Sequence, residues 1–166
     1  MNIFYLSECP KEAAELQCDK HVVKMILETA QLLSTAHHVL DGESPAYKPT
    51  HKNHPSAVWV RESWDNYIWA WRHLAALCKE YTARYHKVHK TEREHLKTLY
   101  QPPMNITKNG FTPPPQCMPD EYKCDNTIEA YQAYYDSKAD EWDYMGMPMK
   151  WYGKGIEQLL PFKIEF

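Results

Sequence analysis

Apolar residues recur at helical spacing over two long stretches of the chain. The first runs from about residue 10 to Leu40 and the second from about residue 56 to Tyr85. In the second stretch, apolar and aromatic side chains repeat every three to four residues from Trp59 to Tyr81, which is the spacing of one helix face. A proline stands at the start of each stretch, where a helix tolerates it. We therefore predict two long helices.

Shorter elements follow the two long helices. Thr91 and Glu94 form a capping-box pattern, which predicts the start of a short helix. Residues 101–122 contain six prolines, which excludes regular structure over most of that segment. A last helix is predicted from Thr127 to about Tyr144. The predicted fold is therefore mainly α: a compact single domain over residues 1–166, built as a bundle of three to four helices with a long Pro-rich loop.

The composition is typical of a folded cytoplasmic protein. Of the 166 residues, 43% are hydrophobic and 13% are aromatic, which is enough to bury a core. Five cysteines occur without a CxxC pair, so we expect reduced thiols. No apolar run approaches the ~18 residues that span a bilayer, and the start lacks both a basic region and a long apolar stretch. We therefore expect no signal peptide and no membrane partner.

Charge is distributed unevenly along the chain. The formal net charge is −3, which argues against a protein that coats DNA by bulk charge. From Pro45 to Arg61, however, there is no acidic residue, and the cations are Lys48, Lys52 and Arg61. From Asp120 to Asp143, eight acids accompany two lysines. This asymmetry allows one basic face on an acidic protein.

A polar stripe interrupts the first long helix. His21, Lys24 and Glu28 fall at positions i, i+3 and i+7, on one face of a helix whose other residues are mostly apolar. A carboxylate that loses water has a raised pKa unless a cation or donors compensate, and this is a common preparation for a general acid or base. The alternative is a structural Glu28 that reaches solvent or pairs with Lys24 four residues earlier.

Two further patterns offer contacts for a nucleic acid. His51 and His54 lie in the acid-free segment, and no second pair of metal-ligand side chains accompanies them. We therefore expect no metal ion and predict phosphate contact for both, with a metal-dependent hydrolase as the alternative. Near the end of the chain, Trp151, Tyr152 and Lys154 combine rings that stack on bases with a cation for phosphate, although such rings more often pack in a core.

Three segments resemble a known family, in chain order. The segment "DKHVVKMILE" contains Asp19, His21 and Glu28, "MPDEYK" follows the proline run, and Trp151 to Lys154 read "WYGK". Together they are similar to the phage endonuclease V family, the pyrimidine-dimer DNA glycosylases that also cleave abasic sites. The segments "CDKHVVKM" and "YKPTHKNHP" also resemble a group of proteins common in tailed phages, which would place the protein in the host cytoplasm.

The resemblance implies a mainly α fold that acts on duplex DNA with a flipped nucleotide, as a monomer and without a cofactor. In the family, the free N-terminal α-amine attacks the sugar C1′ and forms an imine. Transferred by position, that amine belongs to Met1, or to Asn2 if the methionine is removed. Glu28 becomes the catalytic carboxylate, and His21 contacts DNA or orients the site.

Two positions beside Glu28 differ from the family pattern. The family places arginines directly before its Glu and three residues after it, where this chain has Leu27 and Gln31. The candidates for phosphate contact are therefore Lys24, Lys48, His51, Lys52, His54 and Arg61. Three functions stay open: a glycosylase and abasic-site lyase at a damaged or modified pyrimidine, a non-catalytic DNA-binding or host-interaction protein, and a transferase or hydrolase acting on a modified base or nucleotide.

Overall fold

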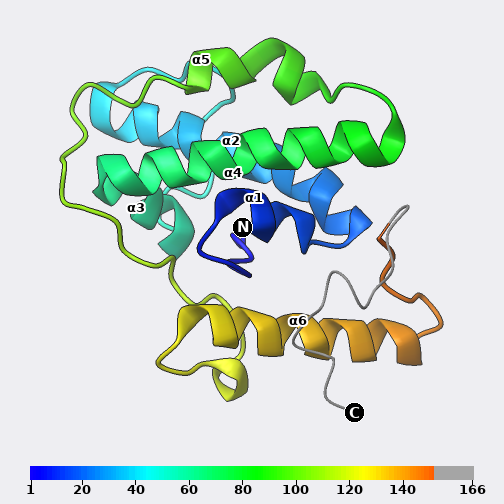
Figure 1. The fold of residues 1–166 in the computed structure, drawn as a ribbon. Coiled ribbons are helices and arrows are strands. Elements are labelled where there is room, and N and C mark those ends of the chain that lie inside the picture. The colour runs from blue at the N-terminus through cyan, green and yellow to red at the C-terminus, as the bar shows by residue number, and fades with distance from the viewer. Residues whose placement is uncertain (152–166) are drawn as a thin grey trace.

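The structure is a computed structural model that describes residues 1–151, and these residues form helices joined by loops (Figure 1). The prediction of a mainly α fold is confirmed, since no strand occurs among the described residues. The elements are α1 (Pro10–Glu15), α2 (Asp19–Asp41), α3 (Pro55–Glu62), α4 (Trp64–Tyr85), a π-helical turn (Glu92–Leu96), α5 (Lys97–Leu99), a 3-10 turn (Asp120–Tyr122) and α6 (Thr127–Tyr144).

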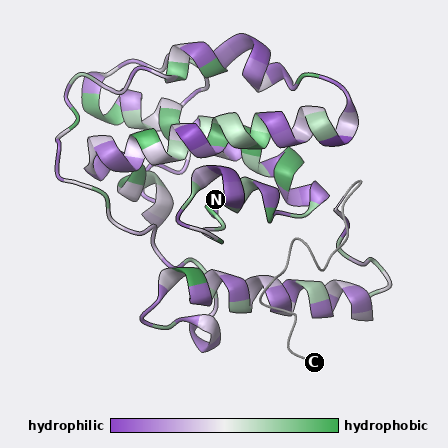
Figure 2. Cartoon of the chain, in the orientation of Figure 1, coloured by the Kyte–Doolittle hydropathy of each residue, from purple (hydrophilic) through white to green (hydrophobic). Residues whose placement is uncertain are grey.

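The long helices α2 and α4 form the centre of the core, and α1 and α3 pack against them. Ile26 and Leu33 of α2 and Leu74 and Leu77 of α4 are all fully buried, so the apolar faces of these helices meet each other. Figure 2 shows hydrophobic residues concentrated in the layer of α1, α2 and α4 and hydrophilic residues over much of α6. No helix in the described part of the chain is both long and apolar enough to cross a membrane.

The N-terminal arm, residues 1–7, joins this layer to α6. It forms no strand, and the ring of Phe4 packs on Tyr131 and Tyr135 of α6, with ring centroids 6.5 and 5.6 Å apart. On its other side, Phe4 stacks on His21 of α2 at 4.3 Å. One ring of the arm therefore contacts both α2 and α6.

The first predicted long helix is two helices, with a break after α1. The buried Arg84 guanidinium donates to the carbonyl oxygens of Glu15 at 3.1 Å and Gln17 at 2.7 Å. At the start of α2, the amide of Cys18 donates to the hydroxyl of Tyr135 at 2.6 Å. These partners satisfy backbone groups that a continuous helix would pair internally, so the chain can turn here at low cost.

The second predicted long helix also breaks, at Ser63. This residue has extended backbone angles, and its hydroxyl accepts from the Asp65 amide at 3.2 Å, which caps α4. The same hydroxyl donates to the Gly110 carbonyl oxygen at 2.6 Å. The Pro-rich segment therefore lies against the junction of α3 and α4 and holds the break in place.

Candidate active site around Glu28

Glu28 lies half-exposed on α2, at the side of an open groove of about 610 Å³. We call this hollow the Glu28 groove; its lining residues are Val23, Lys24, Leu27, Glu28, Gln31, Tyr47, His89, Lys90 and Thr91. The α2 residues supply one wall, and the segment that leads into the π-helical turn supplies the other. The half-exposed side chain agrees with the predicted alternative of a Glu28 that reaches solvent. Among residues 1–151 Glu28 forms no ion pair, so the other alternative, a pair with Lys24, is not observed.

The acid-free segment packs along α2 as a basic loop, residues 45–54. Ser34 of α2 donates to the Tyr47 carbonyl oxygen at 2.7 Å and accepts from the Tyr47 amide at 3.0 Å. Thr35 accepts from the Thr50 amide at 3.2 Å. The Tyr47 hydroxyl also lies 2.7 Å from Thr91 Oγ1, across the Glu28 groove. The basic loop is therefore fixed to the helix that carries Glu28 and forms the link between the two walls.

His54 ends the basic loop and caps α3. Its Nδ1 accepts a hydrogen bond from the Ser56 amide at 3.1 Å, so the neutral ring carries its proton on Nε2. Burial lowers the pKa of His54 below its ordinary value; the positive N-terminal amine and His51 lower it further, and Glu28 partly opposes them. The α-amine and the Glu28 carboxylate are thus both within electrostatic reach of the His54 ring.

Polar contacts hold the N-terminal arm near the start of α3. The side-chain amide of Asn2 donates to the Cys117 carbonyl oxygen at 2.9 Å. The Cys117 sulfur lies 3.7 Å from Ser56 Oγ, next to the amide that binds His54. Met1 packs against the core. The contacts of Asn2 and Cys117 therefore hold the N-terminal arm beside the start of α3, which His54 caps.

His21 is placed differently from Glu28, although both belong to the predicted stripe. It is 5% exposed, stacks on Phe4 and has its Nδ1 3.0 Å from the Tyr135 hydroxyl. Burial, aided by Lys138, Lys24 and Lys20, lowers the pKa of His21 to about 3, so the ring is neutral. Its contacts position the arm that leads to Met1. Its predicted participation in catalysis stays a prediction.

The predicted cations lie on or beside the basic loop. Lys48 and Lys52 are exposed, and Lys24 is exposed at the Glu28 groove. Arg61 donates from Nη1 to the Lys52 carbonyl oxygen at 2.6 Å, so its guanidinium braces the loop. Backbone strain marks His51, whose φ of 48° is left-handed and whose Nδ1 lies 2.7 Å from Thr50 Oγ1.

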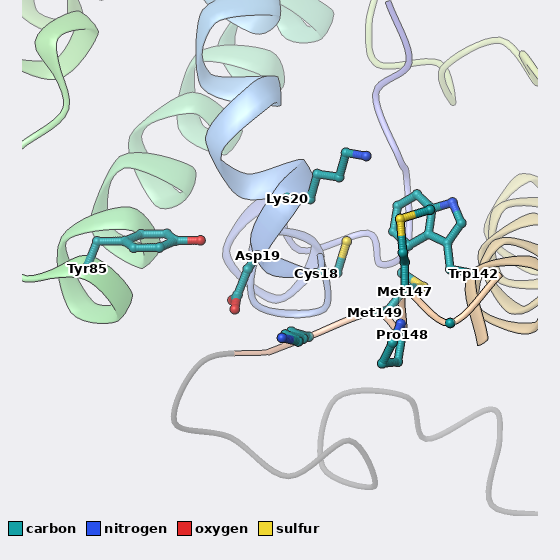
Figure 3. Close-up of a pocket in the computed structure, with 10 residues that line it drawn as sticks. Cys18, Asp19, Lys20, Tyr85, Trp142, Met147, Pro148 and Met149 are labelled. Atoms are coloured by element: carbon teal, nitrogen blue, oxygen red, sulfur yellow. The ribbon is translucent and has the colours of Figure 1, made fainter.

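A second hollow lies at the amino end of α2 (Figure 3). It has a volume of about 560 Å³ and is lined by Cys18, Asp19, Lys20, Tyr85, Trp142 and residues 146–150. Glu28 follows Asp19 by nine residues, about 14 Å further along the helix axis. The two hollows are therefore separate features of one helix.

The predicted C-terminal contacts are only partly described. Trp151 is 6% exposed, and its Nε1 donates to the Leu16 carbonyl oxygen at 3.2 Å, near the break between α1 and α2. Its ring is therefore part of the packing there. Tyr152 and Lys154 lie outside the described residues.

The wall that faces Glu28 could not be predicted from the sequence. Nothing in the sequence relates Tyr47, His89 or Lys90 to Glu28, and Thr91 was predicted only as the cap of a short helix. Only the fold brings these residues to α2. Gln31 is the exception, because its position three residues after Glu28 puts it on the same helix face. No group of three or more His, Cys, Asp or Glu residues in the described chain is placed to hold a metal ion.

Comparison with known proteins gives one match. A family model for pyrimidine dimer DNA glycosylases matches residues 1–93, which is more than half of the chain. A search of curated proteins and a search of solved structures each found no match. The matched span includes Met1, His54 and every residue that lines the Glu28 groove. The chain belongs to the pyrimidine dimer DNA glycosylase family.

Proposed function

We propose that this protein is a DNA N-glycosylase with abasic-site lyase activity, acting on a damaged or modified pyrimidine nucleotide. The observation that carries the proposal is the proximity of a carboxylate and an α-amine: Glu28, which lines a groove with cations on its rim, and the N-terminal amine are both within electrostatic reach of His54. Amine and carboxylate are the two groups that imine chemistry at a sugar carbon requires.

The reaction begins with the unprotonated amine of Met1. Its lone pair attacks C1′ of the target nucleotide, the C1′–N bond breaks, and the base leaves with the bonding electrons and takes up a proton. The sugar ring then opens at its oxygen, and C1′ and the amine share a cationic imine. Removal of a proton from C2′ expels the 3′ phosphate and cuts the strand.

Glu28 is the group suited to the charged steps. Its carboxylate is half-exposed and forms no ion pair with a described residue, so it can face a cation that forms during the reaction. A negative charge there stabilises the imine and can accept the C2′ proton. Water entry through the open groove allows the final hydrolysis of the imine.

The groove and its surroundings suit a nucleotide taken out of the duplex. Its volume of about 610 Å³ falls in the range of ~300–1,000 Å³ found for small-ligand sites. Lys24 and Lys90 stand at its rim, and Lys48 and Lys52 extend the positive charge along the basic loop. These cations would hold phosphates while the target nucleotide is flipped.

Borohydride trapping on duplex DNA with one abasic site tests the chemistry. We expect a covalent adduct that peptide mapping places on the first residue of the mature chain, and Glu28→Gln should lower strand cleavage by about 100-fold. Glu43→Gln is the matched control, because Glu43 is an exposed acid outside the groove. Absence of an adduct, or an adduct on a lysine, would overturn the amine mechanism.

A non-catalytic DNA-binding protein is the second candidate. It is favoured by Leu27 and Gln31, which line the groove where the endonuclease V pattern has arginines. This function predicts salt-dependent binding that is unchanged by Glu28→Gln and weakened by Lys48→Ala and Lys52→Ala. Binding of that kind without any borohydride adduct would replace the first proposal.

A further inference from the structure

The ring of His54 is held in one protonation state by its local contacts. Nδ1 accepts the Ser56 amide, the first free amide of α3, because Pro55 has no N–H to offer. Placing a proton on Nδ1 would turn the two nitrogens into opposed donors and remove the cap. The fold therefore favours the neutral ring with its proton on Nε2.

The groups that face this ring come from three elements. The α-amine of Met1 lies on the N-terminal arm, Glu28 on α2 and His51 on the basic loop. The arm is held by the contacts of Asn2 with Cys117 and of Cys117 with Ser56. His54 therefore lies in a cluster with two basic groups and one acid.

A strained turn joins His51 to His54. His51 has a left-handed φ of 48°, which residues with a Cβ adopt rarely. The hydrogen bond from the His54 amide to the His51 carbonyl oxygen, at 2.9 Å, closes the turn between them. Strained positions of this kind persist only where the surroundings enforce them, and they are common at functional sites.

Resting on the proposed function, and so on a mature chain that begins at Met1, we propose that His54 is a positioning residue for the imine step: its neutral ring leaves Glu28 as the charge that faces the cationic imine. A protonated ring would place a second cation within reach of the first. It would also release the cap of α3 and loosen the turn that carries the cluster.

The sign of the pH effect follows from this arrangement. The pKa of His54 is below its ordinary value, through burial first and then through the α-amine and His51. At neutral pH the ring is therefore uncharged, and Glu28 faces the cationic imine without a competing cation from His54. As pH falls through the lowered pKa, the ring gains a charge and support is lost.

Comparison with His54→Asn isolates this effect. Asparagine can cap α3 through its side-chain oxygen but does not titrate. Single-turnover borohydride trapping is measured for both proteins between about pH 5 and pH 8. Any ionisation that does not depend on His54 is common to both proteins and cancels in the ratio of their rates. We expect the ratio of wild type to variant to fall by about threefold or more from the neutral to the acid end.

Two further variants separate the outcomes. His54→Ala removes both the cap and the ring, and thermal unfolding reports the loss of the cap, whereas His54→Asn should unfold near the wild-type temperature. His86→Asn is the matched control, because His86 is exposed, lies outside the cluster and also has a left-handed φ, of 58°, which asparagine tolerates. Its ratio to wild type should not vary with pH. A flat ratio for His54→Asn, or an equal pH effect in His86→Asn, overturns the role of His54. No trapping by wild type overturns the proposed function itself.

Discussion

Two carboxylates on α2 occupy opposite environments. Asp19, at the start of the helix, lies 3.1 Å from the Arg84 guanidinium, which Glu80 also contacts at 3.0 Å. The Arg84 side chain is 1% exposed there, and Asp19, which also lines the second hollow, is held by this ion pair. Glu28, about two and a half turns later, is half-exposed beside an open groove and forms no ion pair with a described residue.

The difference separates a structural charge from one that is available to a substrate. At the Asp19 end, each charged side chain forms an ion pair with another part of the protein, and Arg84 also binds the carbonyl oxygens of Glu15 and Gln17, so the cluster fixes the turn between α1 and α2. At Glu28 no described residue forms an ion pair, which leaves the carboxylate able to face a new cation. Variants of the cluster at Asp19 should therefore lower stability, whereas variants of Glu28 should lower strand cleavage.

Arg84→Met should give the largest loss of stability. It leaves Asp19 and Glu80 without their cation and the Gln17 carbonyl oxygen without its donor. Breaking a buried pair by removing one partner costs about 3–5 kcal/mol. Urea unfolding measures this cost, and Glu28→Gln, with a loss below about 0.5 kcal/mol, is the comparison. Equal losses at the two positions would contradict the division of roles.

Lowering the pH to about 5 should give the next largest loss of stability, because two buried imidazoles stay neutral in the fold. Burial lowers the pKa of His21 to about 3 and that of His73 to about 4. Both rings stay neutral in the fold but protonate near pH 6.5 when unfolded, so their stabilisation is present above that pH and is lost as pH falls toward the folded values. At pH 5 each should cost about 2 kcal/mol.

Unfolding by urea at a series of pH values measures this loss. The neutral state of His73 is required by its contacts, because Nδ1–H donates to the Pro10 carbonyl oxygen at 3.1 Å and Nε2 faces the Gln17 amide nitrogen at 3.0 Å. A stability that stays level from pH 7 to pH 5 would show that these rings accept a proton without penalty.

The sequence predicted the helices but not the points at which they break. Periodicity is a local signal, and it carried over Leu16 and Ser63 without interruption. The breaks depend on distant partners: Arg84 lies 67 residues after Gln17, and Gly110 lies 47 residues after Ser63. Nothing near either break in the chain identifies these partners.

The candidate site shows the same limit. The stripe of His21, Lys24 and Glu28 was visible because helix spacing is visible, yet only two of the three reach the groove. His21 is covered by Phe4 and α6, neither of which its spacing could indicate. The opposite wall, with Tyr47 and Thr91, arises from contacts between segments that share no pattern.

Ser34→Ala tests how far the groove depends on the basic loop. The Ser34 hydroxyl makes two hydrogen bonds with the Tyr47 backbone, and their loss should cost about 1–2 kcal/mol. Trapping on abasic-site DNA should fall with it, because Tyr47 lines the groove. Thr29→Val is the matched control on the same helix, since the buried Thr29 hydroxyl has no hydrogen-bond partner in the described chain. The stability of Thr29→Val should be equal to or greater than that of wild type.

Lys52→Ala should have the smallest effect on stability and a clear effect on DNA binding. Its side chain is exposed, so the free energy of unfolding should change by less than about 0.5 kcal/mol. Removing one lysine that binds a phosphate lowers the slope of log binding constant against log salt by about 1.

Lys11→Ala is the control, because Lys11 is 81% exposed and pairs with Glu15 on α1, outside the basic loop. Fluorescence anisotropy on a short duplex at several salt concentrations measures both slopes. An equal reduction for the two variants would mean that DNA is held by charge over the whole surface, and not along the loop that Ser34 and Thr35 fix beside Glu28.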